Sequence, residues 1–186
     1  MEIVFPKSDL SHIKFLNCQE AELLPFSTRK LPEFLTSFGI PQNSNKAKGL
    51  NNTLKTCEAI ETEKKLCASS LEAMLKFVVS FLGHDAKVYS SQKEDSTTNV
   101  KIFAKEAMAN DVMVCHKMNY LYAVYLCHST KETIAYRLQL IGPKLEKVTQ
   151  IVVYHCNTSS WNTMHIAFEE LHVQKGEASV CHSKTK

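Results

Sequence analysis

A short unit, a cysteine followed by a histidine, recurs in the C-terminal half of this chain of 186 residues. The copies are Cys115-His116, Cys127-His128, Tyr154-His155-Cys156 and Cys181-His182, and they are separated by 10, 25 and 25 residues. Adjacent residues of a β-strand point to opposite faces of its sheet. If each copy lies in a strand, the cysteines share one face and the imidazoles share the other. The repeat therefore predicts a β-rich region with one face able to form disulfides and another able to bind a metal ion.

The imidazoles of the repeat form a candidate metal site. Four neutral imidazoles without a thiolate suit Cu(II), although Zn(II) and Ni(II) also accept such ligands. His116 and His128 lie twelve residues apart in the sequence, which is roughly 40 Å along an uninterrupted strand. To share one metal ion they need a turn between them, for which Met118-Asn119 is the candidate; otherwise they serve two sites.

The third copy of the repeat departs from the others. Tyr154 occupies the cysteine position and a cysteine appears at position 156 instead. Positions 154 and 156 share a strand face, so Cys156 keeps its side but is displaced by about 6.6 Å along the strand. Disulfides join Cα atoms roughly 4.4 to 6.8 Å apart, so a partner placed for position 154 is either reachable from Cys156 or just out of range.

An upstream pair, Cys57 and Cys67, flanks a short charged segment. A disulfide closing so short a loop stabilises a fold by about 2 to 3 kcal/mol in the chain-entropy model; the alternative is two reduced core cysteines. The chain has seven cysteines, so at least one thiol stays unpaired or pairs between chains. Cys18 has no obvious partner.

Hydrophobic periodicity predicts helices upstream of the repeat. Apolar residues between 68 and 82 follow helical spacing, with Ser69 and Glu72 as a capping box and Gly83 as the stop. A weaker helix is expected over residues 49–62 and a short one over 32–39, with a polar loop at 42–48. Strand signals cover residues 120–127, 133–141, 148–156 and 165–173.

Helices followed by strands predict an α+β fold, with an N-terminal helical part packed on a C-terminal β-rich part and stabilised by disulfides. We expect a single domain over residues 1–186. Its parts are an irregular segment with a short helix (1–46), a helical part (47–84) and a β-rich part that carries the Cys-His repeat (85–186).

Charge and hydropathy argue against two classes of partner. The formal charge is +3 and no Lys/Arg stripe is interleaved with aromatic residues, so we expect no nucleic acid. No apolar run approaches the ~20 residues that span a bilayer, so we expect no membrane span. The first six residues do not resemble a signal peptide, so the protein is either intracellular or a secreted protein in trimmed form.

The spacing of the repeat resembles the signature of the BURP-domain family of plant secreted proteins. Thr158-Ser159-Ser160-Trp161-Asn162 followed by His165-Ile166-Ala167-Phe168 resembles the segment that follows the family's third motif. The segments around Cys57 and Cys67, and the opening Phe5-Pro6-Lys7-Ser8-Asp9-Leu10, are also similar to family landmarks. The resemblance therefore covers nearly the whole chain.

The resemblance implies copper as the cofactor and disulfides for the cysteines. Carried over residue by residue, the metal ligands are His116, His128, His155 and His182, with His165 as a further candidate. The implied disulfide cysteines are Cys57, Cys67, Cys115, Cys127 and Cys181, with Cys156 in doubt.

Some members of the family are copper-dependent peptide cyclases that join a Tyr or Trp side chain of a precursor peptide to a carbon elsewhere in that peptide, with dioxygen as oxidant. The resemblance implies the same activity here. The chain's only tryptophan, Trp161, lies within a family motif and its first tyrosine is Tyr89. We therefore expect such an enzyme to act in trans on a separate ribosomal precursor, or its own core segment to have been removed.

Two other hypotheses remain. Some family members are non-catalytic cell-wall or stress-associated proteins, some of them associated with a wall enzyme. A histidine-rich surface is cationic in an acidic wall and would attract pectin, which is anionic. In a reducing compartment the cysteines and histidines would together hold structural zinc. The resemblance itself favours the secretory pathway, the apoplast or the vacuole.

Overall fold

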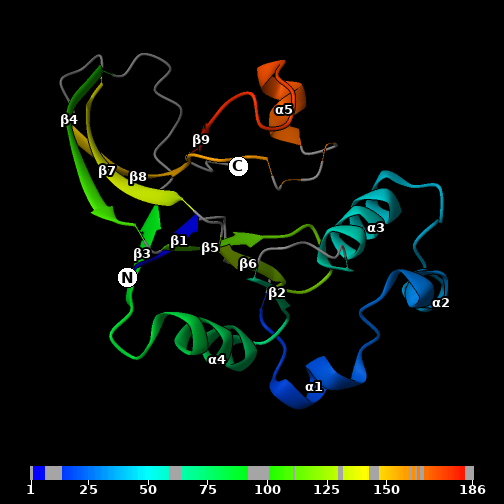
Figure 1. Cartoon of the computed structure of the whole chain (residues 1–186). Coiled ribbons are helices and arrows are strands. Elements are labelled where there is room, and N and C mark those ends of the chain that lie inside the picture. The colour runs from blue at the N-terminus through cyan, green and yellow to red at the C-terminus, as the bar shows by residue number, and fades with distance from the viewer. Residues whose placement is uncertain are drawn as a thin grey trace.

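The computed structural model describes residues 2–6, 14–58, 64–91, 101–110, 112–129, 132–142, 147–159, 161, 163 and 166–182. Helices and two β-sheets make up this part of the chain, which confirms the predicted α+β fold (Figure 1). None of the helices within these ranges is long and apolar enough to cross a membrane.

The elements alternate along the chain more than the sequence pattern predicts. In order they are β1 (Glu2–Pro6), α1 (Cys18–Leu23), a 3-10 helix (Thr28–Lys30), α2 (Leu31–Ser37), α3 (Asn45–Glu58), β2 (Lys64–Ala68), α4 (Leu71–Leu82), β3 (Lys87–Ser91), β4 (Lys101–Ala109), β5 (Val112–Lys117), β6 (Tyr125–Ser129), β7 (Thr133–Ile141), β8 (Lys147–His155), α5 (Ile166–Leu171) and β9 (Val180–His182).

The first sheet, within the described residues, has five strands in the order β2-β6-β5-β1-β3. β1 pairs in parallel with both β3 and β5, whereas β6 is antiparallel to β2 and β5. The segment expected to be irregular therefore contributes a central strand. Five residues at the start of the chain carry no periodic pattern long enough to be recognised, and only the neighbouring strands give them a partner.

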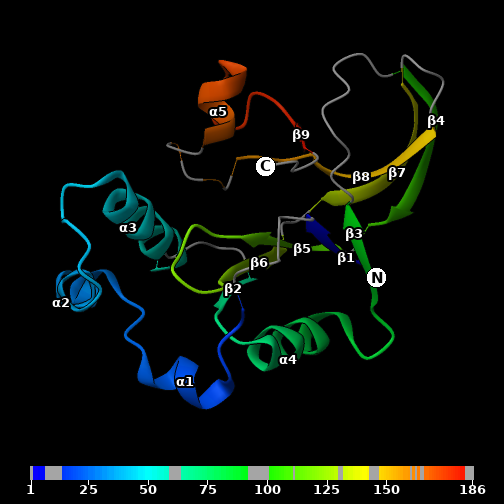
Figure 2. The same ribbon diagram turned by 180° about the vertical axis from the view of Figure 1, so that it is seen from behind.

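The second sheet, as far as the structure describes it, has four strands in the order β4-β7-β8-β9, all antiparallel. The predicted strands over 133–141 and 148–156 correspond to β7 and β8. The sheet is strongly curved, and both views place it across the five-stranded sheet from α4 (Figures 1 and 2). Register shifts within β4 accompany this curvature, as β-bulges bend the strand that carries them.

The strand predicted over 120–127 is confirmed only from Tyr125, where β6 begins, and the strand predicted over 165–173 is wrong. Residues 166–171 form α5, in which Phe168 is buried while Glu169 and Glu170 are exposed. Two adjacent exposed carboxylates break the period-2 alternation that a half-buried strand needs. Phe168 packs with Trp161 and Val180, so burial of one helical face determines the structure of this segment.

Helix α4 covers the face of the first sheet that points away from the second sheet. Its buried residues Met74, Val78 and Leu82 pack against Met113 and Tyr125, among others. The predicted helix is confirmed with a shifted start, because Ser70 and not Ser69 is the N-cap and accepts a hydrogen bond from the amide of Ala73. Gly83 caps the other end with φ 79°, a value that favours glycine.

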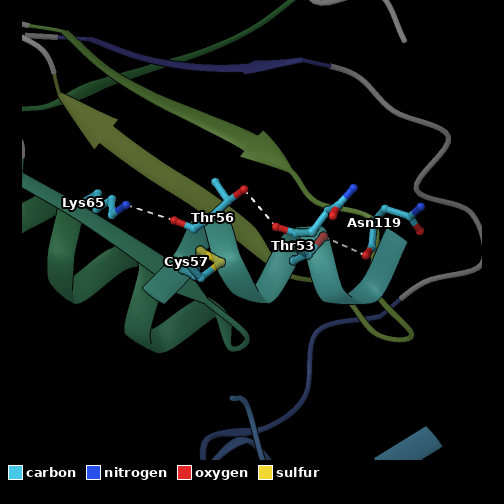
Figure 3. Close-up of a disulfide and its surroundings, with 7 residues drawn as sticks. Thr53, Thr56, Cys57, Lys65 and Asn119 are labelled. Atoms are coloured by element: carbon cyan, nitrogen blue, oxygen red, sulfur yellow. Dashed lines mark hydrogen bonds between the residues drawn. A yellow bond between two sulfur atoms is a disulfide. The ribbon is translucent and has the colours of Figure 1, made fainter. Parts of the chain in front are cut away.

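Helices α2 and α3 form a lobe around the connection between β5 and β6. Residues of α2 and α3 pack on Tyr120 and Tyr122, and the predicted polar loop at 42–48 overlaps the first turn of α3. Thr53 donates a hydrogen bond to the carbonyl oxygen of Asn119, and Lys65 donates one to that of Thr56 (Figure 3).

The Cys57–Cys67 disulfide joins α3 to β2, with Cα atoms 5.7 Å apart (Figure 3). It confirms the predicted pairing, and Cys67 lies in strand β2, between α3 and α4. The disulfide and the hydrogen bonds Thr53–Asn119 and Lys65–Thr56 hold α3 against the edge of the first sheet.

Candidate histidine site between the two sheets

Strands β5 and β6 bring the first two Cys-His copies side by side. In their antiparallel register Cys115 lies opposite Cys127, and His116 lies opposite Leu126. The chain reverses between the strands, with the amide of Met118 donating to the carbonyl oxygen of Val124. The predicted turn at Met118-Asn119 is therefore confirmed as the start of a longer connection.

The two faces of this strand pair have different chemistry. Cys115 and Cys127 are joined by a disulfide, have no exposed surface and pack beneath α4. Because neighbouring residues in a strand alternate between faces, His116 and His128 lie on the opposite face. This separation of sulfur from imidazole is what the repeat predicted.

The histidine face of the first sheet packs against β7 and β8 of the second. Val112 and Val114 contact Ala135, Ile151 and Val153 in one buried apolar cluster. His116 continues the row of alternate residues along β5, and His155 continues the row along β8. The histidines therefore lie at the end of the apolar interface between the sheets, where two of them are buried from water.

Three imidazoles from three strands meet at this end of the interface. The ring centres of His116 and His128 are 5.3 Å apart, and those of His128 and His155 are 6.1 Å apart. His128 lies between the other two and is partly exposed, whereas 8% of His116 and 1% of His155 is exposed. The structure thus brings together three of the four predicted ligands.

His155 has a defined hydrogen-bond partner. Its Nδ1 atom lies 3.1 Å from the hydroxyl oxygen of Thr133, which is also buried. The indole of Trp161 meets the imidazole edge to face, with ring centres 5.0 Å apart. Sequence reasoning did not assign Thr133 or Trp161 to the site. Thr133 and His155 are paired across β7 and β8, and no short-range sequence pattern predicts which residues of two strands lie opposite each other.

The other two predicted histidines are only partly described or not described. The backbone of His182, in β9, pairs with Val153 of β8, two residues along β9 from Val180, which lies opposite His155; the side chain of His182 lies outside the described part. His165 falls entirely outside the described residues.

The fourth Cys-His copy lacks the disulfide that the second copy has. Cys181 lies opposite Tyr154, which stands at the cysteine position of the third copy. Its thiol is free, as are those of Cys156 and Cys18. The expectation that Cys181 takes part in a disulfide is therefore not met in this conformation, because a phenol occupies the paired position. Burial raises the pKa of the Cys181 thiol, while the Lys105 ammonium acts in the opposite direction.

Cys156 lies just beyond the end of β8. Its carbonyl oxygen accepts a hydrogen bond of 3.0 Å from the hydroxyl of Ser179, and its amide donates one to the backbone carbonyl oxygen of Glu132. Cys156 is therefore one diagonal step from Cys181 and not opposite it. The displacement anticipated from the sequence leaves the two thiols unjoined.

The fit of these residues to a metal ion can be judged from their donors and spacing. Two imidazoles that bind one ion at about 2 Å have ring centres roughly 4 to 6 Å apart, close to the two separations found. A histidine that binds through Nε2 commonly donates its Nδ1 hydrogen to a neighbour, and Thr133 offers His155 such an acceptor. Within the described residues, however, no three such side chains already converge on one point. The donor types fit copper, whereas their present arrangement among the described residues is not a closed site.

Known relatives match nearly the whole chain. Residues 1–185 match the family model described as "BURP domain". The chain is 37% identical over 180 residues to "BURP domain-containing protein 3" of Oryza sativa subsp. japonica, an alignment that covers 91% of this chain and 42% of the rice protein.

Two further relatives come from other plants. The chain is 37% identical over 177 residues to "BURP domain protein RD22" of Arabidopsis thaliana. This alignment covers 90% of this chain and 45% of the Arabidopsis protein. It is 35% identical over 199 residues to "BURP domain-containing protein BNM2A" of Brassica napus. This alignment covers 98% of this chain and 71% of the Brassica protein. The chain thus spans less than half the length of the rice and Arabidopsis relatives.

Proposed function

The chain belongs to the BURP domain family, and we propose that it is a copper-dependent oxidative peptide cyclase whose metal is held by His116, His128, His155 and His182. The observation that supports this proposal most is the meeting of three imidazoles, from β5, β6 and β8, at the end of the interface between the sheets. Copper bound there would supply one-electron redox chemistry and would pass electrons to dioxygen.

The chain's own residues would position the ligands and limit water. The contact with Thr133 orients the His155 ring, and Trp161 packs against that ring in a T-shaped arrangement. His128 is partly exposed and leaves an approach from solvent. Each cross-link made in a substrate peptide removes two electrons and two protons from it, so the substrate must reach this exposed side.

The substrate is proposed to be a separate precursor peptide with an accessible Tyr or Trp. The chain's only tryptophan, Trp161, is buried against His155 and Phe168. Tyr120, Tyr122 and Tyr125 are buried as well. These side chains stabilise the fold and are not free to serve as substrate.

Two structural facts favour this proposal over its alternatives. Four of the seven cysteines are in the Cys57–Cys67 and Cys115–Cys127 disulfides, so these four are not available as zinc thiolates. His116 and His155 are buried and add no charge to a pectin-binding surface. Since disulfides persist in oxidising compartments, we propose that the protein functions in the secretory pathway, the apoplast or the vacuole.

The test combines the protein, Cu(II), dioxygen and a panel of precursor peptides that contain Tyr or Trp. We expect a loss of 2 Da per cross-link by mass spectrometry. His128→Ala is expected to abolish this loss, whereas His84→Ala, at an exposed histidine in the turn after α4, should leave it unchanged. No mass loss across a broad panel would reject the cyclase in favour of a non-catalytic wall protein, which pH-dependent binding to pectin would then support.

Metal binding is tested separately from activity. After addition of Cu(II), electron paramagnetic resonance is expected to show hyperfine lines from several nitrogens, and these should weaken in His155→Ala. Unchanged lines in that variant would remove His155 from the ligand set even if cross-linking were observed.

A further inference from the structure

The loop that follows β8 contains one of two sequences in the chain with the form Asn-X-Ser/Thr. They are Asn51-Asn52-Thr53, within α3, and Asn157-Thr158-Ser159, just after β8. Such a triplet is the acceptor for N-linked glycans in proteins of the secretory pathway. The two copies have the same chemistry, so their structural setting decides which of them can carry a glycan in the folded protein.

The Asn157 copy is held in a shape that presents both of its ends to solvent. Thr158, the middle residue, is 1% exposed. Its hydroxyl donates to the carbonyl oxygen of Ala178 at 2.9 Å and accepts from the amide of Gly176 at 3.1 Å. These bonds tie the loop to the segment before β9, whereas Asn157 and Ser159, on either side, are exposed.

The side chain of Asn157 is oriented by Ser159. Its Oδ1 atom accepts hydrogen bonds from the Ser159 amide at 2.9 Å and from the Ser159 hydroxyl at 2.6 Å, which closes the ring of an Asx turn. The oxygen and the nitrogen lie on different sides of a carboxamide, so the Nδ2 atom is on the side turned away from these bonds. The nitrogen that would carry a sugar therefore belongs to an exposed and ordered side chain, with the hydroxyl of the triplet beside it.

The Asn51 copy has the opposite setting. It lies inside α3, where Asn51 is half-buried and Thr53 is 3% exposed. The Thr53 hydroxyl is engaged elsewhere, since it donates to the carbonyl oxygen of Asn119. Leu54, three residues after Asn51, lies on the same side of the helix and is fully buried. A glycan on Asn51 would thus stand at the rim of the face that α3 packs on the lobe.

We propose that Asn157 carries an N-linked glycan in the native protein and that Asn51 does not. The reaction joins the Asn157 Nδ2 atom to the first sugar carbon of an oligosaccharide held on a lipid pyrophosphate. The bond from that carbon to the pyrophosphate oxygen breaks, the lipid pyrophosphate leaves, and the nitrogen gives up one proton. The proposal rests on the secretory location proposed above and needs neither copper nor the cyclase activity.

The test uses the whole chain, secreted from plant cells behind a secretion signal. The secreted protein is treated with a peptide-N-glycosidase that acts on plant glycans, and its peptides are mapped by mass spectrometry. We expect the mass of a glycan to be lost and Asn157, but not Asn51, to be converted to aspartate. Asn157→Gln and Ser159→Ala should lack the glycan, whereas Ser159→Thr and Asn51→Gln should keep it.

A further variant separates the modification from folding. Asn157→Asp retains an oxygen to which Ser159 can donate, so this variant should be secreted and should unfold at a similar temperature once the wild-type glycan has been removed. Wild-type protein secreted with Asn157 unmodified, or with a glycan on Asn51, would overturn the proposal and leave the secretory location standing. Failure of the copper or cross-linking tests would reject the proposed function and leave the glycan in place, because neither takes part in its attachment.

Discussion

Strand pairs β5–β6 and β8–β9 each carry two copies of the same dipeptide unit, yet only one pair is cross-linked. In β5–β6 the register sets cysteine opposite cysteine, and the sulfurs are bonded beneath α4. In β8–β9 the equivalent register sets Cys181 opposite Tyr154, and the thiol is free. The two pairs therefore share a backbone arrangement and differ in one side chain.

The difference shows that the two functions of the repeat are separable. A disulfide requires cysteines at directly paired positions, because its Cα separation is narrowly limited. The imidazole face depends only on which face of the sheet the histidine occupies. His155 consequently keeps its place beside His128 although its neighbour in the motif has changed.

The largest expected effect comes from removing the existing cross-link. Replacing Cys115 and Cys127 together with alanine should lower the free energy of unfolding by about 2 to 5 kcal/mol, because the disulfide is fully buried. Urea unfolding without reductant measures the change. Cys181→Ala under reducing conditions is the matched control and should change stability little; equal losses in both would contradict the distinction between the pairs.

Restoring the cysteine of the third copy should make the two strand pairs alike. Tyr154→Cys places a thiol directly opposite Cys181, and we expect a new disulfide that raises the free energy of unfolding by about 2 to 4 kcal/mol under oxidising conditions. Peptide mapping identifies the bond, and Tyr154→Ser serves as the control without a thiol. Failure of the introduced thiol to pair with Cys181 would show that the register of β9 is different.

A smaller effect is expected at the hydrogen bond that orients His155. Thr133→Val keeps the shape of the side chain and removes the hydroxyl, so the free energy of unfolding should fall by about 1 kcal/mol. Thr149→Val, at an exposed threonine that bonds to Gln139, should change it less. If both variants behave alike in thermal unfolding, the Thr133–His155 contact has no special role.

The smallest effect is expected at the ion pair between β4 and β7. Arg137 and Glu106 are 2.9 Å apart, and the Glu106 side chain is largely exposed. Glu106→Gln should change the free energy of unfolding by about 0.5 kcal/mol or less, and high salt should remove even that difference. A loss in the free energy of unfolding as large as that from removing the Cys115–Cys127 disulfide would show that the Arg137–Glu106 ion pair stabilises the fold as much as the buried cross-link.

Sequence reasoning predicted the parts that depend on short-range pattern. The spacing of the repeat predicted which side chains share a face, and helical periodicity predicted α4. It placed residues 165–173 in a strand, where the structure has α5. Short segments carry little local preference, and the packing of Phe168 with Trp161 and Val180 determined the conformation in this case.

The α+β class, the Cys57–Cys67 pairing and the separation of sulfur from imidazole could all be predicted from the sequence, since they follow from hydrophobic periodicity, from a short loop between two cysteines and from alternation along a strand. The meeting of His116, His128 and His155 between two sheets, the contact of Thr133 with His155, and the position of Cys181 opposite a tyrosine came only with the folded chain. The physical reason is that strand order and register join residues far apart in the chain, and these are set by the burial of whole faces rather than by any local signal.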